Sequence, residues 1–180
     1  MTMKVVLHIC CGVCAAGAAE RLIEEGHEVT GFFCNPNIHP FEEYQKRLEV
    51  ARRVAAELNF PLRVADYAPE VWFAETDSLK DEPEGGRRCE VCFRLRLEET
   101  RRYLEECAAD AFTTTLTIGP RKSAETVNRI GREIGGDRFL VRDFKKKAGF
   151  QRATELAKRW NLYRQHYCGC LYSQKESLRP

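Results

Sequence analysis

Short apolar runs alternate with amphipathic stretches along this 180-residue chain. Met3–Ile9 has the β-branched character of a buried strand, and the alanine-rich stretch from about Cys14 to Glu25 predicts a helix. Repeated alternation of a strand and a helix predicts right-handed strand–helix–strand connections and a mostly parallel sheet with helices on both faces. Further strands are expected at residues 29–33, 61–65, 111–117 and 138–144, and further helices at 44–58, 71–74, 89–106, 123–136 and 150–160. We therefore predict a three-layer α/β fold forming a single domain over residues 1–180.

Seven of the nine cysteines fall into three groups. The first follows the first predicted strand in "HICCGVCAAG", the second begins a helix, and the third flanks a glycine. Because the carboxyl ends of parallel strands meet at one edge of a sheet, the three groups can share one crevice. Cys34 and Cys107 end an apolar strand and an amphipathic helix, which is typical of small core residues. The seven candidate metal ligands are Cys10, Cys11, Cys14, Cys89, Cys92, Cys168 and Cys170.

The grouped thiols favour metal or redox chemistry over structural disulfides. No apolar stretch approaches the roughly 20 residues of a membrane span, and no secretory signal is evident, so a reducing cytoplasmic location is expected. A Cys-x-x-Cys pair at a helix N-terminus lets two thiolates face one metal. Seven thiols would suffice for a four-cysteine iron–sulfur cluster plus a second metal, for two smaller sites, or for one structural zinc with spare cysteines.

The loop after the first strand differs from a phosphate-binding loop. ATP-using enzymes of this architecture place glycines and a hydroxyl there, so that backbone N–H groups surround the phosphates. Here the loop reads "CCGVCA", with one glycine and no Ser or Thr. Thiolates would repel a polyphosphate, so the crevice is better suited to a metal.

Charge is distributed unevenly along the chain. Residues 1–120 carry 14 Lys/Arg against 21 Asp/Glu, whereas residues 121–164 carry 13 against 5. A basic segment suits a phosphate-rich partner such as RNA, and a solvated basic helix face is the alternative reading. The basic C-terminal helical segment, about residues 143–173, also contains Tyr163, which could stack on an unpaired base, and Trp160, whose spacing is that of a core residue. The candidate RNA contacts are Asn35, Asn37, Arg121, Lys122, Ser123, Lys145, Lys146, Lys147, Arg152 and Arg164.

Several long blocks together resemble a known family. They read "HICCGVC", "FFCNPNIHP", "EYQKRLEVA", "EPEGGRRCEVCFRLRLEET", "FTTTLTIGPRKS" and "DFKKKAGFQRATELAKRWNLYRQHYCGCLYS". The chain resembles the cobalamin-independent epoxyqueuosine reductases, the QueH-type family, over about residues 5–173. The resemblance implies a HUP-class domain, related to nucleotide α-hydrolase folds. It also implies two-electron reduction of the epoxide of epoxyqueuosine at the tRNA wobble position, with a [4Fe–4S] cluster, an adjacent mononuclear iron and a ferredoxin- or flavodoxin-like electron donor.

The resemblance also implies roles for individual cysteines. Cys89, Cys92 and the Cys168/Cys170 pair, with one thiol of the first loop such as Cys10, would suit the cluster. The remaining thiols of that loop, Cys11 and Cys14, would suit the separate iron and the catalytic step.

The reaction also needs a proton donor, because the departing oxygen leaves as water. The nearest candidates by sequence are His8, His166 and Tyr167. Tyr167 lies beside Cys168 and is the preferred candidate, whereas His8 sits in an apolar strand, as core histidines do.

Two other classes of function fit parts of the sequence. An ATP-dependent tRNA thiolation enzyme shares the fold class and sometimes carries a cluster, but it predicts a Gly/Ser-rich loop after the first strand. A zinc-stabilised RNA-binding module without catalysis would also explain the cysteines and the basic segment.

Overall fold

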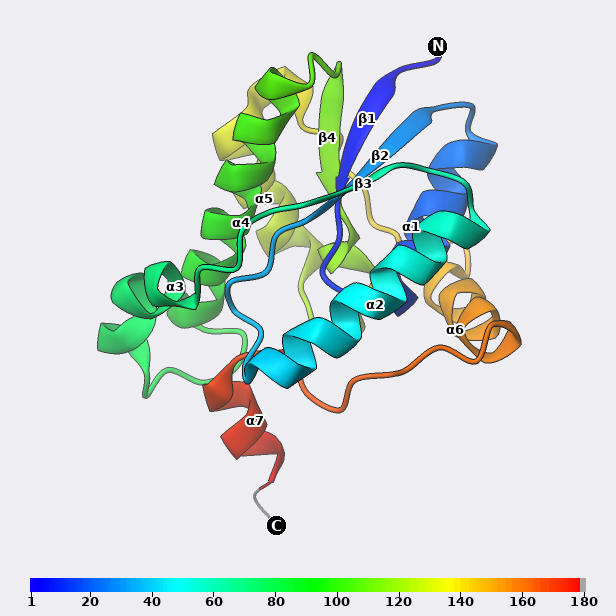
Figure 1. Ribbon diagram of the computed structural model, residues 1–180. Helices are drawn as coiled ribbons and strands as arrows, with labels where there is room; N and C mark the ends of the chain where they lie inside the picture. Colours follow the sequence, from blue (N-terminus) through cyan, green and yellow to red (C-terminus); the bar gives the residue numbers. More distant parts are fainter. Residues whose placement is uncertain (179–180) are drawn as a thin grey trace.

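A four-stranded parallel sheet forms the centre of the computed structural model, which describes residues 1–178 (Figure 1). The strand order is β3-β2-β1-β4, so β1 lies between β2 and β4. Val6 of β1 is in register with Thr30 on one side and Phe112 on the other. Because all pairings are parallel, every strand ends at the same edge of the sheet. The strands are β1 (Lys4–His8), β2 (Glu28–Phe33), β3 (Leu62–Val64) and β4 (Ala111–Thr114).

Helices cover both faces of this sheet and complete the three layers. In Figure 1, α1, α2 and α6 lie on one side of the sheet, and α4 and α5 lie on the other. The short helix α7 lies near the start of α2, below the edge where the strands end. The helices are α1 (Gly12–Glu24), α2 (Phe41–Glu57), α3 (Pro69–Thr76), α4 (Arg87–Glu106), α5 (Ala124–Gly135), α6 (Gly149–Arg159) and α7 (Leu171–Ser177), with 3₁₀ turns η1 (Asp77–Leu79), η2 (Thr115–Ile118) and η3 (Gly136–Arg138). None of the helices in this part of the chain is long and apolar enough to span a membrane.

The predicted three-layer α/β fold is confirmed, and two predicted strands need correction. The strand expected over 111–117 ends at Thr114, whose hydroxyl accepts a hydrogen bond from the Leu116 N–H at 3.1 Å and thereby caps η2. The strand expected over 138–144 is reduced to one isolated bridge between Phe112 and Phe139. Only the Leu140 N–H, donating to the Phe112 carbonyl at 2.8 Å, continues the sheet there.

Cysteines cap the starts of two helices, α1, which was predicted from about Cys14, and α7, which was not predicted. The first helix begins at Gly12, where Cys11 is the N-cap residue and its sulfur accepts a hydrogen bond from the Cys14 N–H. Helix α7 begins after Cys170, whose sulfur accepts from the Ser173 N–H at 3.3 Å. Cysteine is not among the preferred N-cap residues, so sequence patterns do not reveal such starts.

Gly131 of α5 allows a close approach between this helix and the segment after it. A Cβ added at Gly131 would lie 2.2 Å from Cζ of the buried Phe139 ring. Gly131→Ala should therefore lower the free energy of unfolding by about 1–3 kcal/mol, because the added methyl group overpacks this contact. The higher helix propensity of alanine offsets a small part of this loss. Urea unfolding measures the change. Gly119→Ala is the control, since a Cβ there meets nothing closer than 3.9 Å, and an equal loss in both variants would contradict the prediction.

Candidate metal centre

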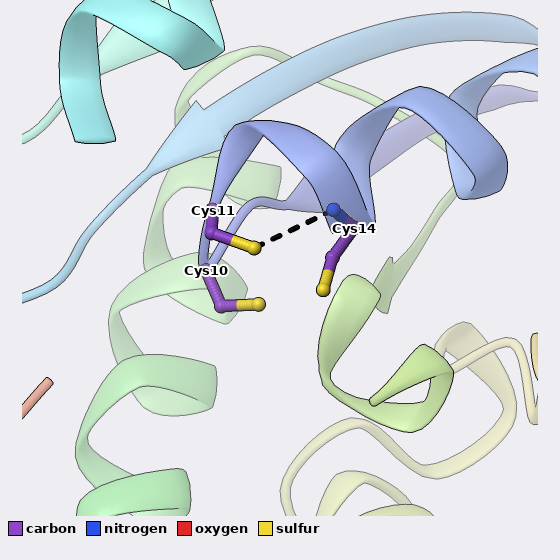
Figure 2. A group of neighbouring side chains, drawn as sticks. All are labelled: Cys10, Cys11 and Cys14. Carbon is purple, nitrogen blue, oxygen red and sulfur yellow. Dashed lines mark hydrogen bonds between the residues drawn. The ribbon is translucent and has the colours of Figure 1, made fainter. Parts of the chain in front are cut away.

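The first cysteine group lies where β1 ends and α1 begins. The Cys10 N–H donates to the Thr115 hydroxyl oxygen at 3.0 Å, and that hydroxyl lies 3.1 Å from the Cys10 sulfur, to which it donates. The Cys14 N–H donates to the Cys11 sulfur at 3.4 Å, which tightens the turn. The sulfur atoms of Cys10, Cys11 and Cys14 consequently lie within 4.8 Å of one another and face a common space (Figure 2). This spacing suits ligands of one metal centre or of two adjoining ones.

Hydrogen bonds among these three thiols shift their pKa values in different directions. Donation from the Cys11 and Cys14 thiols holds the pKa of Cys10 well below its usual value, and the Lys122 ammonium acts in the same direction. The hydrogen bond to Cys10 raises the pKa of Cys11 to about 11, and the pKa of Cys14 is also raised. Cys10 therefore ionises more readily than Cys11 and Cys14, and a metal ion must displace the protons of the thiols to bind all three sulfurs.

The second and third groups lie at the starts of α4 and α7. Cys89 and Cys92 lie in the first two turns of α4, and Cys170 caps α7. Cys92 and Cys170 are both 7 % exposed and pack against Trp72 in one small apolar cluster. Burial raises the pKa of Cys89 and of Cys170, each to about 11. These thiols are therefore protonated without a metal and would need a cation to ionise them.

Two adjoining hollows connect the three groups. Cys10, Cys14 and Cys168 line a hollow of about 270 Å³, and Cys89 and Cys168 line a smaller one of about 110 Å³. The two hollows share four lining residues, which are Glu84, Arg121, Lys122 and Cys168. The structure therefore brings together cysteines that are far apart in sequence, and Cys168 lies on the boundary between the hollows.

Two cations balance the charge of these cysteines. Electrostatic interaction with Cys168, and to a lesser extent with Cys10 and Cys14, raises the pKa of the Lys122 amine despite its burial. Burial opposes the charge of Arg96, which is 2 % exposed, yet neighbouring cysteines led by Cys92 raise its pKa above the usual value. A guanidinium and an ammonium in this position favour an anionic occupant of the hollows.

Hydrogen-bond donors near the cysteines test whether such an anionic group fits. Within residues 1–178, the buried Trp72 Nε1, Arg88 Nε and Arg96 Nη2 atoms have no hydrogen-bond partner. Each of these atoms can only donate, and leaving one unsatisfied costs roughly 1–3 kcal/mol. Unsatisfied donors next to thiolates match the needs of a thiolate-ligated metal cluster, whose sulfur atoms accept hydrogen bonds. The residues present therefore fit such a group.

Arg47 of α2 forms hydrogen bonds with the backbone at the third cysteine group. Its guanidinium donates to the carbonyl oxygens of Cys168 at 2.6 Å and Tyr167 at 3.0 Å, and lies over the Tyr167 ring. Glu43 accepts from Arg47 Nε at 2.7 Å and from the Tyr163 hydroxyl at 2.8 Å. Sequence reasoning missed this pair, although an Arg and a Glu four residues apart on the apolar side of a helix was an available signal.

The loop at residues 35–40 supports the third cysteine group from the other side. The His39 N–H donates to the Gly169 carbonyl at 2.8 Å, and the Leu171 N–H donates to His39 Nδ1 at 3.2 Å. A Cβ at Gly169 would lie 3.2 Å from both Arg47 Nη1 and Asn37 Nδ2, so glycine suits this position. Asn35 is buried and its amide donates to the Ile9 carbonyl at 2.8 Å. Neither Asn35 nor Asn37 lines the hollows described above.

The three proton-donor candidates occupy different environments. His8 is fully buried, with Nε2 donating to the Cys34 carbonyl at 3.1 Å and Nδ1 lying 2.9 Å from the Thr114 hydroxyl. Burial lowers the pKa of His8 to about 4, so it is a neutral core histidine near pH 7. His166 and Tyr167 both line the larger hollow. Burial raises the pKa of Tyr167 to about 12, and its hydroxyl donates to the His39 carbonyl.

The predicted RNA contacts divide into those at the hollows and those away from them. Arg121, Lys122 and Arg164 line the larger hollow, and Ser123 lines the smaller one while its hydroxyl caps α5 at 3.2 Å.

The remaining predicted contacts are engaged elsewhere. The Lys145 ammonium donates to the carbonyls of Thr117 at 2.9 Å and Lys122 at 3.0 Å. Arg152 forms two hydrogen bonds of 2.7 Å with Glu20. Lys146 and Lys147 line a separate surface hollow beside α5.

Comparison with known proteins identifies the family. The family model described as Epoxyqueuosine reductase QueH matches residues 5–176. The chain belongs to this family. An epoxyqueuosine reductase from Streptococcus pyogenes is 36% identical over 181 residues, covering 96% of this chain and 71% of the relative. The relative from Haemophilus influenzae is also 36% identical, covering 97% and 73%. Curated members of the family are thus named as oxidoreductases that act on a queuosine precursor.

Solved structures share the fold at low identity. U34-tRNA thiolase NcsA from Methanococcus maripaludis, solved with its [4Fe–4S] cluster, is 15% identical with a TM-score of 0.55, covering 97% of this chain and 64% of that one. NMN synthetase from Francisella tularensis is 18% identical with a TM-score of 0.53, and the match covers 89% of this chain and 62% of that one. These likenesses confirm the HUP-like fold expected from the family resemblance.

Arg47 provides a test of how the third cysteine group is held. Arg47→Met removes the donors to Tyr167 and Cys168 and leaves the buried Glu43 carboxylate unpaired, which should cost about 3–5 kcal/mol of stability. Faster amide exchange over residues 163–171 should accompany the loss. Arg52→Met on the same helix should change stability by less than about 0.5 kcal/mol, because its ion pair is exposed and 3.9 Å long. Unchanged exchange in the Arg47 variant would refute this role.

Proposed function

We propose that this chain is an epoxyqueuosine reductase acting at the tRNA wobble position. The reaction takes the epoxide, two electrons and two protons to an alkene and one water molecule. The observation that carries the proposal is the convergence of three cysteine groups on adjoining hollows lined by Lys122 and Arg96. Family membership supports the substrate, because the curated relatives are named for this reaction.

We propose that the cysteines hold a [4Fe–4S] cluster and a mononuclear iron. Cys10, Cys89, Cys92 and Cys170 would bind the cluster, and Cys11 and Cys14, with Cys168 facing them, would bind the iron. Because the Cys10 sulfur lies within 4.8 Å of the other two sulfurs in its group, two metal sites divided in this way would lie side by side. When bound, the two groups would supply electrons and a Lewis acid for the epoxide oxygen.

The chain's own residues would position the substrate and supply a proton. Lys122 and Arg96 hold positive charge beside the thiolates, where they limit the negative charge that accumulates in the hollows. We propose Tyr167 as the proton donor, since it lines the larger hollow and its raised pKa keeps the hydroxyl protonated. Arg47 positions this residue through its carbonyl and ring.

We propose that the RNA is bound over the larger hollow. Arg121, Lys122 and Arg164 would contact phosphate or the nucleoside, and the exposed Phe150 ring at the hollow offers a stacking surface. Lys146 and Lys147 would extend the basic surface along the bound RNA, with Lys145 and Arg152 supporting it. Ser123 would form part of the wall of the smaller hollow, and the buried Asn35 and Asn37 would support the site from outside the two hollows. A ferredoxin- or flavodoxin-like protein would deliver the electrons in the cytoplasm.

The thiolation alternative gains support from the fold shared with a tRNA thiolase. The two functions differ at the loop after β1, where a thiolase of this class would bind the phosphates of ATP. Here three thiols occupy that loop, which has one glycine and no Ser or Thr with which to surround a phosphate. ATP-dependent sulfur incorporation into tRNA would favour this alternative over reduction.

An anaerobic assay tests the proposed reaction. Reconstituted protein, a chemical reductant and tRNA bearing epoxyqueuosine are combined, and the nucleosides are analysed by mass. The expected product is lighter by one oxygen atom. An unchanged nucleoside, with the cluster and the tRNA intact, would overturn the proposal. A colourless protein that binds a single zinc after anaerobic purification would instead favour the zinc-stabilised module.

Replacement of single cysteines tests the proposed ligands. Cys89→Ala should lose the cluster, because it removes one of four thiolates. Cys34→Ala is the matched control, since Cys34 is buried in the core and lines neither hollow. The measurements are iron and sulfide content and visible absorbance after anaerobic reconstitution. Loss of the cluster in both variants would show that the cluster ligands have been assigned to the wrong cysteines.

The exposed ring of Phe150 provides a test of tRNA binding. Phe150→Ala should weaken binding by about 1–3 kcal/mol if a base stacks on this ring. Phe41→Ala is the control, because Phe41 is similarly exposed but lies outside both hollows. Binding isotherms of the unmodified tRNA at fixed salt measure the difference. Equal affinities for the two variants would exclude stacking at Phe150.

A further inference from the structure

Trp72 is a buried residue whose polar atom lacks a partner. Its side chain is 1% exposed, and within the described residues 1–178 its indole nitrogen has no hydrogen-bond acceptor. An indole N–H can only donate, and buried tryptophan usually finds a partner for it. The family comparison and the reaction give this residue no role. Its unsatisfied donor indicates a group that accepts hydrogen bonds when present.

The surroundings of Trp72 identify that group by its chemistry. Trp72 packs against Cys92 and Cys170 in one apolar cluster. A buried thiol becomes a thiolate when it binds a cation, and a thiolate sulfur accepts hydrogen bonds. A negatively charged cysteine sulfur in this cluster is therefore the group that best suits the indole N–H as a hydrogen-bond acceptor.

Neighbouring rings fix the orientation of the indole. The rings of His39, Phe73 and Tyr172 lie 5.1, 5.3 and 5.9 Å from that of Trp72, measured between centroids. Tyr172 is itself held by a hydrogen bond of 3.1 Å from its hydroxyl to Asp77. A donor held on several sides cannot turn away to find another acceptor, so its hydrogen bond is preorganised.

We propose that the Trp72 indole N–H donates a hydrogen bond to the metal-bound Cys92 sulfur and raises the reduction potential of the cluster. This inference rests on the proposed function, in which Cys92 is a cluster ligand. Trp72 is a positioning and tuning residue here, since it acts on the cluster through a ligand and does not contact the substrate.

The physical basis is the charge that the cluster gains on reduction. Uptake of one electron from a reductant adds one negative charge, which spreads over the iron, sulfide and thiolate atoms. A hydrogen-bond donor stabilises the more negative reduced form more than the oxidised form, and hydrogen bonds to the sulfurs are among the factors that set these potentials. Because an indole does not titrate near neutral pH, its effect persists across the working pH range.

The chain contains only two tryptophans, Trp72 and Trp160, which gives a matched pair of variants. Trp72→Phe keeps an aromatic ring but removes the N–H, and Trp160→Phe makes the same change away from the cysteines, at the end of α6. All three proteins are reconstituted anaerobically and titrated with dithionite while the reduced-cluster electron paramagnetic resonance signal is followed. The midpoint potential of Trp72→Phe should shift to a more negative value, and that of Trp160→Phe should equal the wild-type value.

A second measurement does not depend on the Trp72 variant folding. Trp160→Phe is prepared with ¹⁵N-labelled indole, so that Trp72 is the only labelled tryptophan. Pulsed electron paramagnetic resonance of its reduced cluster should show a ¹⁵N coupling. Absence of that coupling, or an unshifted potential in a cluster-loaded Trp72→Phe protein, would overturn the inference and leave the proposed function standing. A wild-type protein that binds no iron–sulfur cluster would overturn both.

Discussion

Parallel pairing of β1 with both β2 and β4 determines where the first cysteine group lies. The pairing brings the residues after β1 next to those after β4, where the Thr115 hydroxyl exchanges hydrogen bonds with the Cys10 backbone and sulfur. The same edge receives the loop after β2, whose His39 supports the Cys168–Cys170 turn. Segments from three parts of the chain thus meet at one edge because each strand ends there.

The balance of charge among the side chains at this edge of the sheet determines which ligands can bind there. Several thiols buried together would stay protonated, because burial raises the pKa values of Cys89 and Cys170. Lys122 and Arg96 offset part of this cost, and a bound metal would offset the rest. In related folds the loop after the first strand receives the phosphates of a nucleotide. Here the sulfur atoms of Cys11 and Cys14 face that space, which suits a metal better than a phosphate.

The sequence predicted most of the helices and strands, but fewer of the hydrogen bonds that hold the candidate site together. Apolar periodicity located α1 to α6 and most strands, because the spacing of apolar residues reflects local backbone geometry, but it did not reveal α7. The stretch 138–144 has the composition of a strand, yet it makes a single bridge to Phe112, which only tertiary contacts could reveal. Cysteine spacing indicated the three groups. The hydrogen bonds from Arg47 to Tyr167 and Cys168 span a long sequence separation, so no local pattern predicts them.

The caps formed by Cys11 and Cys170 would connect the proposed metal binding to the formation of two helices. Each sulfur accepts a backbone N–H in the first turn of its helix, Cys14 in α1 and Ser173 in α7. Cys11 and Cys170 lie far apart in the sequence, so during synthesis the first group leaves the ribosome long before the third. A centre that used both groups could be completed only after the segment with Cys168 and Cys170 had emerged. Its assembly would therefore follow synthesis of the whole sheet and of the helices between the two groups.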